Sequence, residues 1–216
     1  MNNRFKEYYF DANGDKNLRS IRKALASALY KTTVAAEKIT GRSINDLPEY
    51  FLSVKTAEFI HQHYDTFTFS MEDSISALIK DIGMSEALES LTRKNGNVDL
   101  IIRGKRQTQV KHLVEFKRGF KEENHLKDIL RLAEFCRFSP FGHKTEKNYM
   151  VMVAPVSAQQ MIDRHHSIEQ YLYEIFGNRI GVSVEYVDLS EHLSTRATKH
   201  KDKPLFGAVC ELKYLA

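Results

Sequence analysis

Apolar residues recur at three- and four-residue spacing in several long segments of the chain. Such spacing places apolar side chains on one face of a helix. The pattern predicts helices over residues 17–39, 46–63, 72–83, 85–94, 122–138 and 158–176. We expect Asp46 to cap the second of these helices, with Pro48 in its first turn, where a proline is tolerated.

Shorter apolar segments with the two-residue period of a strand lie between these helices. Residues 149–156 form an almost continuous apolar run, which is typical of a buried central strand. The pattern also predicts strands over residues 66–70, 182–189 and 205–215, and a hairpin over 97–119 that turns near Gly104. Helices and strands mixed in this order predict an α/β fold, with a mixed central sheet flanked by helices.

The length of 216 residues suits one domain with an elaboration. We expect residues 1–45 to be a helical elaboration packed on a main domain of residues 46–216. No apolar run approaches the length of a membrane span, and residues 1–15 do not resemble a signal peptide. The two cysteines, Cys136 and Cys210, form neither a metal-ligand spacing nor a disulfide framework, so a reducing, cytoplasmic location is expected.

The formal net charge of +4 is a mild excess, but the basic residues are unevenly distributed. Many of them crowd around the predicted hairpin, and the group consists of Arg103, Lys105, Arg106, Lys111, Lys117, Arg118 and Lys121. A local basic cluster of this kind suits a phosphate backbone. A second basic run over residues 199–203 is interpreted as solvated surface.

Three charged residues of the hairpin occupy positions that are unusual for a plain strand. Asp99 lies inside an apolar run, and Glu115 and Lys117 flank Phe116 at the end of another. Strand alternation places Glu115 and Lys117 on the same face. Two carboxylates and an amine can hold a divalent metal and support phosphodiester chemistry. The alternative is an ordinary surface ion pair, but charges within apolar strands are unusual without a partner or an ion.

This constellation resembles the catalytic core of the PD-(D/E)XK nuclease superfamily, over about residues 46–190. The matching residues are Asp99, Glu115 and Lys117, and Val98 stands where the motif often has proline. The resemblance implies a restriction-endonuclease-like core and a nuclease dependent on Mg²⁺ or Mn²⁺. It also implies Asp99, Glu115 and the backbone carbonyl of Phe116 as metal ligands. Lys117 would orient or activate the attacking water.

Members of that superfamily often add an acidic residue from the first core helix, and Glu49 is the candidate here. Glu72, Glu86 and Glu89 compete for this role, and an acid in the first turn of a helix is also stabilised by the helix dipole alone. In the helix after the hairpin, His125, Asp128 and Arg131 share one face, either as DNA contacts or as a solvated polar stripe. The candidate nucleic-acid contacts are Arg103, Lys105, Arg106, Lys111, Arg118 and Arg131.

These observations predict a metal-dependent nuclease with DNA as its partner, compatible with roles in host defence, phage biology or repair. A catalytically weak or inactive module that binds nucleic acid or a partner protein through the same fold is the alternative. A third interpretation is an interaction protein whose N-terminal helices dock or form a homodimer. Adjacent histidines on a helix point apart, so we do not expect His165 and His166 to form a metal site.

Overall fold

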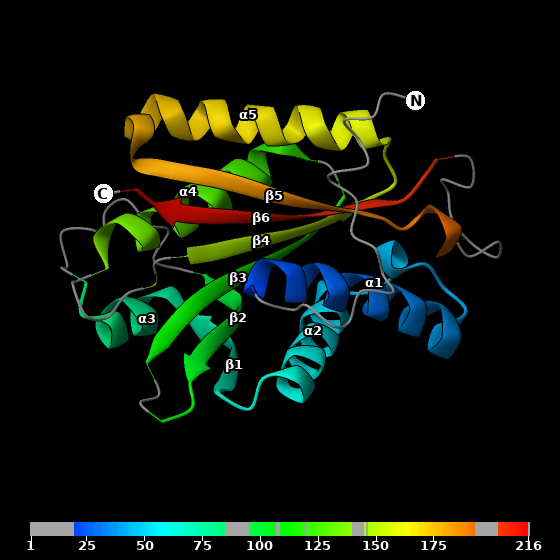
Figure 1. Cartoon of the computed structure of the whole chain (residues 1–216), viewed down its shortest axis with the longest axis horizontal. Coiled ribbons are helices and arrows are strands. Elements are labelled where there is room, and N and C mark those ends of the chain that lie inside the picture. The colour runs from blue at the N-terminus through cyan, green and yellow to red at the C-terminus, as the bar shows by residue number, and fades with distance from the viewer. Residues whose placement is uncertain are drawn as a thin grey trace.

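The fold is a six-stranded mixed sheet between two layers of helices (Figure 1). The computed structural model describes residues 20–84, 96–106, 109–119, 121–139, 145, 147–192 and 203–215, without the side chains of 122–124. The helices are α1 Ile21–Thr40, α2 Glu49–His63, α3 Ile75–Ile82, α4 Glu122–Phe138 and α5 Ala158–Phe176. The strands are β1 Phe67–Ser74, β2 Asn97–Gly104, β3 Val110–Arg118, β4 Lys147–Ala154, β5 Ile180–Asp188 and β6 Phe206–Tyr214.

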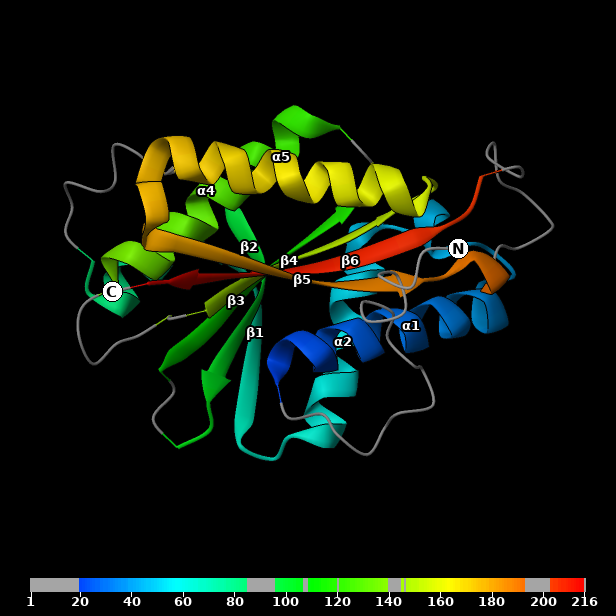
Figure 2. The ribbon, with the colours of Figure 1, turned by 45° about the horizontal axis from the view of Figure 1, so that its top comes forward.

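The strand order across the sheet is β1-β2-β3-β4-β6-β5. The first three strands form an antiparallel meander, and β3 then pairs in parallel with β4. A parallel pair requires a crossover connection, which α4 supplies here. Strands β6 and β5 complete the sheet in antiparallel fashion. Figure 2 shows how the twist of the sheet turns the β1–β3 half away from the β5–β6 half.

Each face of the sheet has its own apolar core. On one face, α1 and α2 pack with residues such as Leu100 and Val114. On the other face, α3, α4 and α5 pack with residues such as Ile101 and Leu113. Because successive side chains of a strand point to opposite faces, this alternation places Glu115 and Lys117 on the α4 side.

The observed elements confirm the predicted α/β fold with a mixed sheet and correct several boundaries. Helix α3 begins at Ile75 rather than at Glu72, because β1 extends to Ser74 and the Ser74 hydroxyl caps the helix by accepting from the Ala77 N–H. Asp46 does not cap α2: it lies in the short 3-10 helix Ile44–Asp46, and Pro48 precedes the first helical residue of α2. The predicted helix over 85–94 lies outside the described residues.

Helix α1 is an integral part of one helical layer. Its residues Leu25 and Leu29 are fully buried in the same core as strand residues of β2, β3 and β4. Cys136 and Cys210 are buried free thiols. Across the described residues, the structure has no helix with the length and apolar character needed to traverse a lipid bilayer.

Candidate active site

The candidate site lies where the end of β3 loses its backbone pairing with β2. The ladder of the two strands runs from the hairpin turn to the Leu100–Val114 pair. Beyond it, the backbone N–H of Phe116 donates to Asp99 Oδ2, with an N···O distance of 2.6 Å. Two residues further on, the N–H of Arg118 donates to Glu49 Oε1 at 3.0 Å. Two carboxyl groups, from β2 and α2, therefore complete the edge of β3.

The carboxyl groups of Asp99 and Glu115 lie close enough for each to affect the pKa of the other. Glu115 is only 1% exposed. Burial raises its pKa to about 8, although Arg131 and Lys117 act in the opposite direction. Burial also raises the pKa of Asp99, against the effect of the Phe116 N–H. Burial therefore favours the protonated form of both carboxyl groups in the metal-free protein.

Two cationic side chains lie beside this carboxyl pair. Lys117 Nζ is 2.9 Å from Asp128 Oδ2 and 3.8 Å from Glu115 Oε2. Arg131 Nη2 is 2.9 Å from Asp128 Oδ1 and makes a short contact with Glu115 Oε1. Burial alone would lower the pKa of Lys117, but Glu115, Asp128 and Asp99 together raise it above its ordinary value. Lys117 is therefore an ammonium group held in place by Asp128.

The face of α4 that carries Asp128 and Arg131 points into the protein. His125 is 2% exposed and Arg131 is 7% exposed. The interpretation of this face as a solvated stripe is wrong, and the expected contact of Arg131 with phosphate does not fit a buried guanidinium paired with Glu115 and Asp128. The sequence alone does not show which side of an amphipathic helix packs against the strands that carry the carboxyls.

Arg103 and Arg118, two of the candidate DNA contacts, are engaged within the protein. The Arg103 guanidinium is 3.1 Å from Asp73 Oδ2 and 2.5 Å from Asp81 Oδ2, so it links β2 to β1 and α3. The Arg118 guanidinium donates to the backbone carbonyl of Asn45 at 2.9 Å. Arg118 lies at the site, but this bond directs it toward the segment before α2.

The remaining candidate contacts lie at the far end of the hairpin. Lys105 and Arg106 are exposed in the turn, and Lys111 lies nearby, donating to Gln109 at 3.3 Å. At about 3.3 Å per residue, six residues of strand place Lys105 about 20 Å from Asp99. Lys105 and Arg106 thus lie well away from the carboxyl pair along β2. They border a separate hollow of about 750 Å³, which Asp65, Thr66, Gly104, Lys105 and Arg106 line.

Among the proposed acids for the first-helix position, Glu49 is the one that reaches β3. Its charge raises the pKa of Asp99, which indicates that the two side chains interact. Glu72 is exposed on β1 and has a left-handed backbone, with φ of 57°; its carboxyl group accepts from Asn97 Nδ2 at 3.4 Å. Glu86 and Glu89 lie outside the described residues.

Sequence reasoning missed one buried acid next to this group. Glu134 follows Arg131 by three residues on α4 and is 4% exposed. Burial raises its pKa to about 7, with Arg131 opposing that shift. Among the described residues, no hydrogen-bond partner is found for Glu134 Oε2. The repeat of Asp128, Arg131 and Glu134 at three-residue steps was the signal that could have identified it.

The donor set fits a hard divalent cation. Four carboxyl groups, from Asp99, Glu115, Glu49 and Asp128, surround two cationic side chains, so full ionisation leaves an excess negative charge. The N–H and C=O of one strand residue point to the same side, so the carbonyl of Phe116 faces Asp99. Mg²⁺ is held by oxygen ligands and usually by one or two carboxylates, because it keeps several waters. Asp99, Glu115 and this carbonyl meet that requirement.

Comparison of the chain with models of known protein families, with curated proteins and with solved structures gave no match. The chemistry of the site itself therefore carries the functional argument.

Proposed function

We propose that this protein is a metal-dependent nuclease that hydrolyses phosphodiester bonds in DNA. The observation that carries this proposal is the half-buried Asp99 beside the buried Glu115, with the Lys117 ammonium 3.8 Å from Glu115. An ordinary surface ion pair would not bury an acid beside a second acid, because burial disfavours the charged form.

The order of the elements supports a restriction-endonuclease-like core. The PD-(D/E)XK resemblance implies a helix, a strand with the aspartate, a strand with the Glu-x-Lys sequence and a following helix. Here α2 precedes the β1-β2-β3 meander, Asp99 lies on β2, Glu115 and Lys117 lie on β3, and α4 follows. Helix α3 is then an insertion between β1 and β2, and α1, α5, β5 and β6 extend the core.

The residues divide into metal ligands and groups that act on the phosphate. Asp99, Glu115 and the Phe116 carbonyl would hold Mg²⁺ or Mn²⁺. When bound, such an ion supplies charge neutralisation at the phosphoryl oxygens and a bound water of lowered pKa. Because its pKa is raised, Lys117 remains an ammonium, stabilises negative charge on the phosphoryl group and orients the attacking water rather than accepting its proton.

A second set of side chains contacts the proposed metal ligands and Lys117. This set consists of Asp128, Arg131 and Glu49. Asp128 accepts from the Lys117 ammonium at 2.9 Å and so positions it. Arg131 contacts Glu115 Oε1 and favours the ionised form of this carboxyl group. Glu49 accepts from the Arg118 N–H and lies close enough to Asp99 to affect the pKa of Asp99. It would therefore either accept a hydrogen bond from a metal-bound water or support the edge of β3.

A cleavage time course tests the proposal. The substrates are plasmid and linear single- and double-stranded DNA, with Mg²⁺, with Mn²⁺ or with chelator. Asp99→Ala should abolish cleavage, and Lys117→Ala should reduce the rate by ~10²-fold or more while metal binding persists. Lys55→Ala, which removes a surface ion pair with Glu58, is the matched control. Wild-type protein that is inert on every substrate, or variants that cleave as it does, would favour a non-catalytic binding module.

A further inference from the structure

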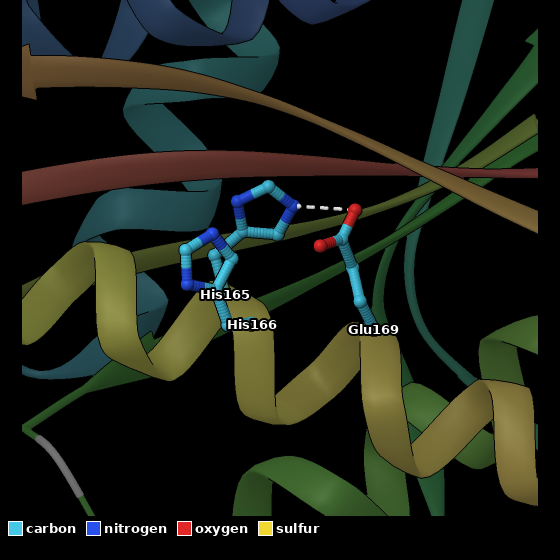
Figure 3. Close-up of side chains that lie close together, drawn as sticks. All are labelled: His165, His166 and Glu169. Carbon is cyan, nitrogen blue, oxygen red and sulfur yellow. Dashed lines mark ion pairs between the residues drawn. The ribbon is translucent and has the colours of Figure 1, made fainter.

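A second group of metal-binding side chains lies on α5, away from the carboxyl pair. Figure 3 shows that the side chains of His165, His166 and Glu169 lie close together along this helix. One ligand atom from each residue can be chosen so that all three lie within 4.8 Å of one another, and no other group of three such residues in the described part of the chain meets this limit. Adjacent histidines on a helix were expected to point apart, but these two have ring nitrogens close enough together to reach one ion.

The contact between His165 and Glu169 brings two possible ligand atoms together. His165 Nε2 and Glu169 Oε1 are 3.1 Å apart and form an ion pair when the imidazole is protonated. Two donors that bind one tetrahedral zinc ion at about 2.0–2.2 Å lie about 3.3–3.6 Å apart. The observed separation of 3.1 Å is close to this range.

Tyr186 on β5 orients the His165 ring. Its hydroxyl lies 2.8 Å from His165 Nδ1, and the two rings contact each other edge to face. When Nδ1–H donates to the Tyr186 oxygen, the lone pair of Nε2 is available to a metal. Metal-binding histidines generally have an outer partner of this kind, which fixes the tautomer and the ring orientation.

Two imidazoles and one carboxylate favour a borderline metal such as Zn²⁺ over Mg²⁺. Three protein ligands leave a fourth position of a tetrahedral ion open to water or to another donor. A hollow of about 700 Å³ adjoins the group, and its lining includes His166, Glu169, Tyr173 and Leu215. Solvent and small donors therefore have access to the open position.

We propose that His165, His166 and Glu169 form a binding site for Zn²⁺ that is separate from the Asp99–Glu115 pair. Strands β4 and β6 lie between β3, which carries Glu115, and β5, which carries Tyr186, so at about 4.8 Å per strand these two strands are ~14 Å apart. The first site offers carboxylate and carbonyl oxygens and the second offers imidazole nitrogens. The two sites thus select different metals.

Titration of the full-length, chelator-treated protein with Zn²⁺ alone, by calorimetry and by competition with Co²⁺ absorption, tests this proposal. We expect a site that His166→Ala or Glu169→Gln weakens by more than ~10-fold and that Tyr186→Phe weakens by about 10-fold. His61→Ala, at an exposed histidine on α2, is the matched control and should bind Zn²⁺ as the wild type does.

Asp99→Ala should also keep the Zn²⁺ site, which separates this proposal from the nuclease assignment. His166 and Glu169 are exposed, so their substitutions should preserve the fold, and circular dichroism checks this. Unchanged Zn²⁺ affinity in both His166→Ala and Glu169→Gln would overturn the proposal, as would loss of Zn²⁺ binding in Asp99→Ala.

Discussion

Replacing Glu115 by glutamine tests whether the carboxyl pair holds a proton in the metal-free protein. Burial raises the pKa of Glu115 from 4.5 to about 8. Between these values the folded protein retains a proton that the unfolded chain has released, so the free energy of unfolding falls as the pH rises. One proton changes this free energy by about 1.4 kcal/mol per pH unit, so Glu115 contributes a fall of roughly 3 kcal/mol between about pH 5.5 and 7.5.

Urea unfolding followed by circular dichroism, with chelator present, measures this slope. The Glu115→Gln variant should lack the part of the pH-dependent fall in the free energy of unfolding that Glu115 contributes, because glutamine does not titrate. Burial raises the pKa of Glu134 to about 7, in the same direction, so Glu134→Gln is the matched control and should lose only the Glu134 share. A Glu115→Gln protein with the full wild-type slope would refute the reasoning.

Mg²⁺ extends the same measurement to the proposed metal site. A cation requires ionised carboxylates, so Mg²⁺ should stabilise the wild type more at pH 8.5 than at pH 6. Glu115→Gln should show little of this stabilisation. Equal stabilisation of both proteins by Mg²⁺ would place the ion elsewhere.

Three further predictions follow from the ion pairs of the site and from the hairpin turn. Arg131→Met should destabilise the chelator-treated protein more at pH 9 than at pH 6, because it leaves Glu115 without its cation and Glu115 is charged only at the higher pH, and Mg²⁺ should recover part of this loss in thermal unfolding. Glu49→Gln should reduce the cleavage rate less than Asp99→Ala does, measured under single-turnover conditions. Lys105→Ala combined with Arg106→Ala should weaken DNA binding and reduce its salt slope by about one per lost phosphate contact, whereas Arg103→Ala should mainly lower the melting temperature.

Local patterns along the sequence were sufficient for most of the elements. Helices α4 and α5 have the predicted bounds of 122–138 and 158–176, because each carries an uninterrupted apolar stripe. The hairpin and the shared face of Glu115 and Lys117 were also predictable, because side chains two residues apart on a strand point to the same face of the sheet. The position of Asp46 was not, since a single turn of 3-10 helix between α1 and α2 depends on how the chain packs around Ile44, which is fully buried.

The parts of the site that the sequence did not reveal depend on contacts between distant segments. Glu49 reaches β3 across 69 positions of sequence, through the Arg118 N–H. The inward direction of Arg131 follows from the packing of α4 on the strands that carry Glu115. The basic residues of the hairpin turn were misplaced because proximity in sequence says little along an extended strand, where six residues span about 20 Å.

The separation of the cationic turn from the acidic site has a consequence for the proposed substrate. Duplex DNA rises about 3.4 Å per base pair, so the ~20 Å between Lys105 and Asp99 corresponds to about six base pairs. Near the proposed cleavage site, the acidic groups outnumber Lys117 and Arg131, so this region attracts phosphate only after a divalent cation has neutralised its excess negative charge. The exposed Lys105 and Arg106 can attract the backbone without a metal. Metal-free DNA binding should therefore depend on the turn, and metal-dependent cleavage should depend on the carboxyl pair.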